Sequence, residues 1–308
     1  MSKNNYIYSS ILLLLTSNIY AQSPVQYLTG YLAAVRNDNT QSVPTVIFAD
    51  NQNEAVLIQT VIPYLSDSLD LIRRKAYYIT KRIGEKSADQ QVRQQTVALL
   101  TKGIGDNDRG ISGYNSNALK GFDKADFSQS EREALGSFIN PQTPYLDQVV
   151  KLAGYIGEES YRNGLVAIAT SEVDFSIRWA SRLARARMGD PASIDYIMRK
   201  LRQAPINDDL VYDVVPDLIY TRQGIVFKFL EDIINSDQAS CLSADPDSDD
   251  KILCGYRVME YLAPVIEDFP VAVDEFGDVQ VDDYEQALVD VRAWFTANPN
   301  YKIDSNKY

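Results

Sequence analysis

The sequence predicts an all-α protein, an α-α superhelix (solenoid) of stacked helix pairs that ends in a C-terminal capping helix. Apolar residues recur with helical spacing from about residue 53 onward, in segments that short breaks separate. Asp, Ser or Pro precedes most of these segments, as is typical of helix N-termini. Glycines at expected helix ends recur at intervals of 37, 36, 32 and 35 residues, a period typical of stacked repeats; they are Gly84, Gly121, Gly157, Gly189 and Gly224.

Residues 1–21 have the composition of a signal peptide. Lys3 precedes a short apolar block at 11–15, and the small residue Ala21 stands at the expected cleavage point. The block is too short to span a bilayer, so we expect no membrane span here. We predict export to the periplasm or the extracellular space, with a buried N-terminal helix as the alternative.

Residues 22–52 are expected to form an N-terminal helix and an extended segment, with a strand or an extended loop at 43–49. The repeat array is predicted over residues 53–268. Its helices and the final one are expected to begin near Asn53, Ser68, Ala88, Asp108, Ser128, Pro144, Glu159, Asp174, Pro191, Asp208, Gln223, Ser248 and Asp283. Residues 269–308 are predicted to be an acidic insertion, forming a loop or hairpin, and the capping helix at 284–298.

One short sequence pattern occurs twice. Residues 70–76 (DLIRRKA) align with residues 174–180 (DFSIRWA), and a glycine and a second helix follow each. The later copy, with its MGDP turn at 188–191, resembles HEAT or HEAT-like repeats, in an exported, bacterial-type member. The resemblance covers about residues 53–268 and implies helix pairs stacked into a curved solenoid, whose concave face binds a protein partner. A globular all-helical domain is the structural alternative.

The two cysteines, Cys241 and Cys254, are separated by a short loop. In an oxidising compartment, a single pair of this kind predicts a disulfide. Two free buried thiols are the alternative.

Charge and composition exclude several functions. The chain has no histidine, which rules out Ser-His-Asp hydrolases, HExxH metalloproteases and His-ligated zinc within it. The net charge of −12 argues against nucleic acid as a partner. Residues 1–205 carry 23 basic and 20 acidic residues and residues 206–308 carry 7 and 22, so the acidity belongs to the C-terminal third.

Arg178, Arg182 and Arg185 occupy positions i, i+4 and i+7 of one predicted helix. Such spacing places them in one stripe, which could bind an anionic group of a partner. The alternative is a solvated face whose arginines pair with Asp190 and Asp195.

Asp245, Asp247 and Asp249 alternate in the loop that the cysteines enclose. Alternating carboxylates are typical of calcium loops, but Asp250 and Tyr256 stand where an EF-hand requires glycine and glutamate. A non-standard calcium site and a helix-capping solvent loop are therefore the two interpretations.

These features favour a secreted or periplasmic scaffold for protein-protein interaction, with no catalysis and no cofactor. The acidic pairs at 158–159 and 208–209 lie at expected helix starts, where they stabilise the helix dipole without any chemistry. The alternative is an exported carboxylate-dependent enzyme or calcium-dependent glycan-binding protein that uses the loop at 245–250.

Overall fold

A computed structural model describes residues 23–37, 42–49, 53–243, 247–274 and 277–308. The predicted signal peptide therefore lies outside the described residues. Within them the chain is mostly helical, with 14 α-helices and one two-stranded antiparallel sheet. No described helix is both long enough and apolar enough to cross a bilayer.

The first half of the chain forms α1 to α7, with short 3-10 turns between several of them. The bounds are α1 (Pro24–Arg36), α2 (Glu54–Val61), α3 (Asp70–Lys86), α4 (Gln90–Gly103), α5 (Arg109–Ala118), α6 (Gln129–Ser137) and α7 (Leu146–Ile156).

The second half continues with helices and contains the small sheet. The bounds are α8 (Arg162–Thr170), α9 (Phe175–Arg187), α10 (Pro191–Leu201), α11 (Val215–Tyr220), α12 (Gly224–Ile234), β1 (Ala239–Leu242), β2 (Lys251–Leu253), α13 (Gly255–Leu262) and α14 (Tyr284–Ala297).

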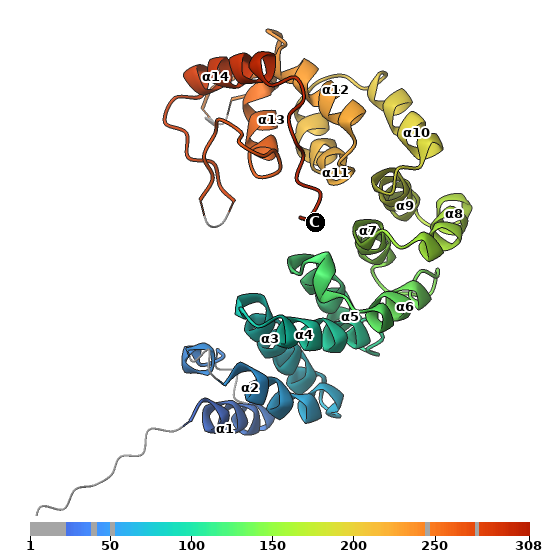
Figure 1. The fold of residues 1–308 in the computed structure, drawn as a ribbon, viewed down its shortest axis with the longest axis vertical. Coiled ribbons are helices and arrows are strands. Elements are labelled where there is room, and N and C mark those ends of the chain that lie inside the picture. Colours follow the sequence, from blue (N-terminus) through green and yellow to red (C-terminus); the bar gives the residue numbers. More distant parts are fainter. Residues whose placement is uncertain (1–22, 38–41, 50–52, 244–246, 275–276) are drawn as a thin grey trace, which may run out of the picture.

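The helices follow one another in chain order along an open arc (Figure 1). Helices α1 and α2 lie at one end, α13 and α14 at the other, and the chain ends inside the arc. The apolar residues form two clusters that meet at α9: Ala180 and Ala184 belong to the first, Leu183 and Ala186 to the second. Adjacent sides of one helix therefore contribute to the two cores.

Several expected helix starts are confirmed by their caps. The side chains of Asp89, Asp108, Asp190 and Asp283 each accept a hydrogen bond from a backbone N–H in the first turn of α4, α5, α10 and α14. These bonds satisfy backbone donors that the helix itself cannot pair.

The helix-end glycines are confirmed in part. Gly157 and Gly189 have φ of 80° and 79° and follow α7 and α9, as left-handed caps do. Gly121 ends a 3-10 turn. Gly84 instead lies inside α3, where a Cβ would come within 2.4 Å of Thr96 Oγ1, and Gly224 begins α12. For these two, the predicted role was wrong.

Two other expectations about local structure were wrong. The segment at 43–49 contains a 3-10 turn (Thr45–Phe48) rather than a strand. No helix begins near Ser248, because residues after it pair as β2 with β1. The predicted hairpin before α14 is present as an antiparallel bridge between Val273 and Val279.

The sulfurs of Cys241 and Cys254 lie 2.04 Å apart, at disulfide-bonding distance. The bond joins the end region of β1 to the residue just before α13. It fixes the small sheet against the second core, where both cysteines are buried.

We expect the Cys241→Ala/Cys254→Ala double variant to lose about 3 kcal/mol of unfolding free energy, because the oxidised loop restricts the unfolded chain. Urea titration of the oxidised protein and the variant measures this difference. Dithiothreitol should destabilise the natural chain by a similar amount and leave the variant unchanged; an equal effect on both would contradict the prediction.

Close approach of α7 to α9 requires glycine at position 154. A Cβ there would lie 2.5 Å from Ala184 Cα and 2.5 Å from Tyr220 Oη. We expect Gly154→Ala to lower the unfolding free energy by about 1–3 kcal/mol through overpacking. Gly30→Ala is the matched control, since a Cβ on α1 meets nothing within 4 Å and should stabilise the helix slightly. Urea unfolding should show a lower unfolding free energy for Gly154→Ala, and a slightly higher one for Gly30→Ala, than for the natural chain.

Candidate functional site

The predicted arginine stripe on α9 is engaged within the fold. Arg178 donates to the carbonyl of Val173, and the guanidinium of Arg182 lies 4.1 Å from the centre of the Tyr196 ring. Arg185 pairs with Asp190 at 2.9 Å, one of the two partners that the structural alternative names. All three side chains are half-buried against neighbouring segments.

The structure describes only part of the acidic loop. Asp245 lies outside the described residues, while Asp247 and Asp249 precede β2. Among the described residues, no three or more acidic or cysteine side chains are grouped to hold a metal ion. The calcium site at Asp245, Asp247 and Asp249 stays a prediction.

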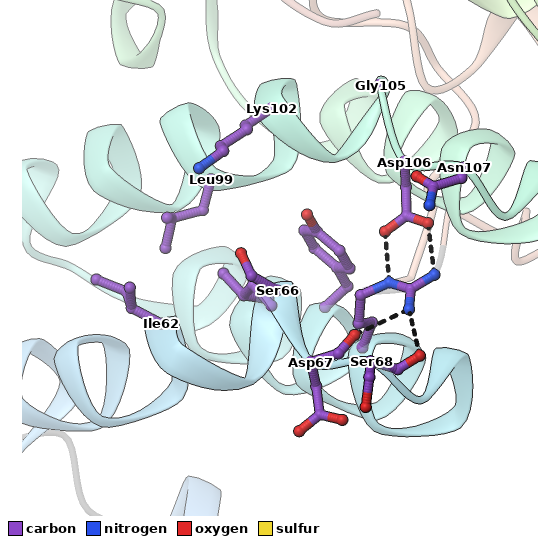
Figure 2. Close-up of a pocket in the computed structure, with 12 residues that line it drawn as sticks. Ile62, Ser66, Asp67, Ser68, Leu99, Lys102, Gly105, Asp106 and Asn107 are labelled. Atoms are coloured by element: carbon purple, nitrogen blue, oxygen red, sulfur yellow. Dashed lines mark hydrogen bonds and ion pairs between the residues drawn. The ribbon is translucent and has the colours of Figure 1, made fainter.

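A pocket of about 450 Å³ lies between the segment at 62–68, α3 and the end of α4 (Figure 2). Arg73 reaches across one side of it and forms two hydrogen bonds to Asp106, of 2.8 and 2.9 Å, and one to the carbonyl of Asp67. The guanidinium of Arg73 therefore joins α3 to the turn after α4. Lys102 of α4 also lines the pocket, whereas Arg73 is held in ion pairs and hydrogen bonds at its edge.

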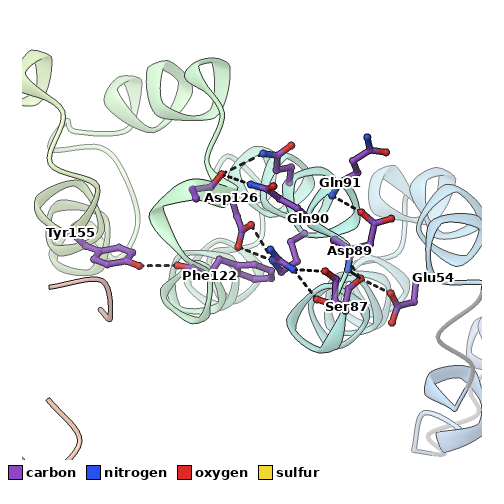
Figure 3. A network of polar contacts seen from close by, with 12 residues as sticks. Glu54, Ser87, Asp89, Gln90, Gln91, Phe122, Asp126 and Tyr155 are labelled. Atoms are coloured by element: carbon purple, nitrogen blue, oxygen red, sulfur yellow. Dashed lines mark hydrogen bonds and ion pairs between the residues drawn. The ribbon is translucent and has the colours of Figure 1, made fainter. Parts of the chain in front are cut away.

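The Arg73–Asp106 pair belongs to a series of contacts between residues 33 positions apart, which we call the 33-residue contacts. Figure 3 shows three more: Arg93 pairs with the buried carboxylate of Asp126 at 3.1 Å, Ser87 donates to Glu54, and the Tyr155 hydroxyl oxygen lies 3.1 Å from the carbonyl oxygen of Phe122. Another member joins Arg187 to the carbonyl of Tyr220. Segments at this constant separation in the chain are thus connected at several points along the arc.

Cations and tyrosines gather where the chain ends inside the arc. We call this group the inner cluster; it consists of Lys120, Lys124, Lys151, Tyr155, Arg187, Tyr220 and Arg222. Arg187 lies over the rings of Tyr155 and Tyr220, at 5.1 and 4.8 Å from their centres. The three come from the ends of α7, α9 and α11, so successive helix pairs supply one member each. Arg222 follows α11 with a φ of 54°.

Residues 304–308, which we call the inner segment, lie against this cluster. Arg222 Nε donates to the carbonyl of Asp304 at 2.8 Å, and Arg187 Nη2 to that of Lys307 at 2.6 Å. The Tyr155 hydroxyl has one proton, which it shares between the carbonyl of Asn306 at 2.6 Å and that of Phe122 at 3.1 Å. The cluster therefore binds the main chain of an extended segment.

The side chain of Tyr308 fills an aromatic slot in the cluster. Its ring centre lies 5.6 Å from that of Tyr155 and 5.4 Å from that of Tyr220. Lys120 Nζ lies 5.2 Å from the same ring centre, a cation-π distance. The slot therefore holds one aromatic ring against the rings of Tyr155 and Tyr220 and the ammonium group of Lys120.

Several cations of the inner cluster are buried close together. Burial lowers the pKa of Arg222 to about 10, and the neighbouring charge of Arg187 lowers it in the same direction. Burial also lowers the pKa values of Arg187, Lys120 and Lys124. Desolvated cations that repel one another occur at functional sites, and here they stand beside the carbonyl and ring contacts just described.

The inner cluster is not evident from the spacing of arginines along one helix. That spacing favours Arg178, Arg182 and Arg185 over Arg187. The available signal was the interval of 32 or 33 residues that separates Tyr155, Arg187 and Tyr220.

We expect Asp106→Asn to lower the unfolding free energy by about 2 kcal/mol at pH 7, because Arg73 then loses its carboxylate in a largely buried site. Burial alone would raise the pKa of Asp106, but hydrogen bonds from Arg73 and the Asp108 backbone lower it. The stability from the carboxylate is thus complete above about pH 4 and is lost as the pH falls through the lowered value.

Urea unfolding at pH 7 and at progressively lower pH measures the difference in unfolding free energy between Asp106→Asn and the natural chain. This difference should become smaller as the pH falls. The control is Asp70→Asn, whose carboxylate is exposed and lies 3.5 Å from Arg74. Its effect should stay below about 0.5 kcal/mol. A difference for Asp106→Asn that does not depend on pH would contradict the prediction.

Comparison with protein-family models finds none that matches the sequence, and comparison with curated proteins finds none that is similar. A proposal about function therefore starts from the inner cluster and the segment that it holds.

Proposed function

We propose that the chain is an exported α-solenoid of HEAT-like helix pairs, which binds an extended segment of a protein partner along the concave side of its arc and catalyses no reaction. The observation that carries this proposal is the inner cluster, which already holds residues 304–308 through the backbone oxygens of all five. Main-chain oxygens are present in every peptide, so the same donors suit a segment from another protein.

The arrangement of the helices supports the solenoid. The helices follow one another along an arc (Figure 1), and the 33-residue contacts join segments at a constant separation in the chain, as a repeat of this length would. In a repeat array each unit covers the apolar face of its neighbours and leaves one side free for partners. The left-handed glycine between α9 and α10 supports the HEAT-like turn.

The cysteine pair supports export. Both thiols of the described chain are paired with one another at bonding distance. Such a pair persists in oxidising compartments and is uncommon in the reducing cytosol. The composition of residues 1–21 leads to the same proposal.

Site-specific photo-crosslinking in the native host tests this proposal. A benzophenone amino acid at Lys120, in the inner cluster, is expected to give a discrete adduct with a protein of the cell envelope. The same amino acid at Val166, an exposed residue of α8 on the outer side of the arc, is the matched control. Adducts at Val166 without any at Lys120 would contradict binding on the concave side.

A further inference from the structure

The inner segment contacts the cluster in a way that another segment could reproduce. Beyond Asp304, the side chains of Ser305, Asn306 and Lys307 are exposed. The contacts come instead from carbonyl oxygens and from the ring of Tyr308. The cluster therefore binds an extended backbone and one aromatic side chain, and it does not contact the side chains of residues 305–307.

The aromatic slot selects the ring rather than the hydroxyl. The phenolic oxygen of Tyr308 is buried and has no hydrogen-bond partner among the described residues. A buried polar atom of this kind costs free energy that a ring without a hydroxyl avoids. Phenylalanine in the same place would keep the contacts to Tyr155, Tyr220 and Lys120.

Release of the inner segment requires no unfolding of either core. The chain is fixed to the second core up to Asp304, whose N–H donates to the carbonyl of Val265, and Ile303 forms an antiparallel bridge with Ile266. Beyond this point, residues 305–308 cross to Tyr155 on α7. These four residues can leave the cluster while Ile303 stays in place.

Charge indicates what kind of segment competes best. Asp304 is the carboxylate of the inner segment that acts on Arg187 and Arg222, and both guanidinium groups are largely desolvated. Lys307 adds a further positive charge to a group of cations. A segment with additional carboxylates complements the cluster better than the inner segment does.

We infer that residues 305–308 occupy the binding site of the protein in cis and that the partner displaces them with an acidic, extended segment carrying a tyrosine or phenylalanine. This inference rests on the proposed function and adds the class of ligand and its regulation. The tethered segment acts as an intramolecular competitor at high effective concentration, so the partner binds with reduced apparent affinity.

The test uses the full-length chain and a fluorescein-labelled peptide with the sequence of residues 301–308. We expect Tyr308→Ala to increase the affinity for this probe by about tenfold or more over the natural chain, as measured by fluorescence anisotropy, because the cis competitor loses its ring. Lys302→Ala is the matched control, since its side chain is exposed and outside the cluster. Tyr308→Phe, which keeps the ring, should bind the probe no better than the natural chain does.

A probe that ends in alanine instead of tyrosine should lose its binding, and a probe that ends in phenylalanine should keep it. Adding Arg187→Gln to the Tyr308→Ala chain should abolish binding of the tyrosine probe. Circular dichroism establishes that each variant is folded. Equal affinity for the natural chain and Tyr308→Ala, or no binding to a folded Tyr308→Ala chain at millimolar probe, would overturn the inference.

If the peptide-binding tests fail while photo-crosslinking at Lys120 succeeds, the proposed function stands and the inner segment only stabilises the fold.

Discussion

The architecture depends on the contacts that join each helix pair to the next. Among the 33-residue contacts, Arg73 and Arg93 each bind a carboxylate that lies later in the chain, and each also donates to a carbonyl of the loop before its own helix. Packing alone would allow neighbouring helices to rotate relative to one another, whereas a bidentate ion pair fixes direction as well as distance. These contacts therefore hold the helices of the first half of the arc in a defined orientation.

Local chemistry explains which parts of the fold could be predicted from the sequence. The caps at Asp89, Asp108 and Asp190 and the left-handed glycines at 157 and 189 are decided by a few adjacent residues. Gly84 and Gly224 could not be distinguished from these, because one depends on the approach of Thr96 and the other begins a helix. The loop after Cys241 was mistaken for a helix start, since β1 and β2 pair across a disulfide that helical spacing does not reveal.

The candidate site was less predictable for a related reason. Helical spacing shows that Arg178, Arg182 and Arg185 share a face, but it does not show that Val173, Tyr196 and Asp190 already engage them. The inner cluster combines Lys120 with residues from three later helix ends and with Tyr308. Only the path of the arc brings these residues together, so no single window of sequence contains the signal.

The inner segment also limits the shape of the whole molecule. It is fixed at Asp304 to the second core and inserts Tyr308 between rings of α7 and α11, so that one side chain packs against both cores. Four residues span at most about 14 Å when fully extended. While Tyr308 is seated, the two halves of the arc cannot move apart beyond this tether. Occupancy of the slot and the opening of the arc are therefore thermodynamically linked, so that a force or ligand that opens the arc must also weaken the hold on the ring.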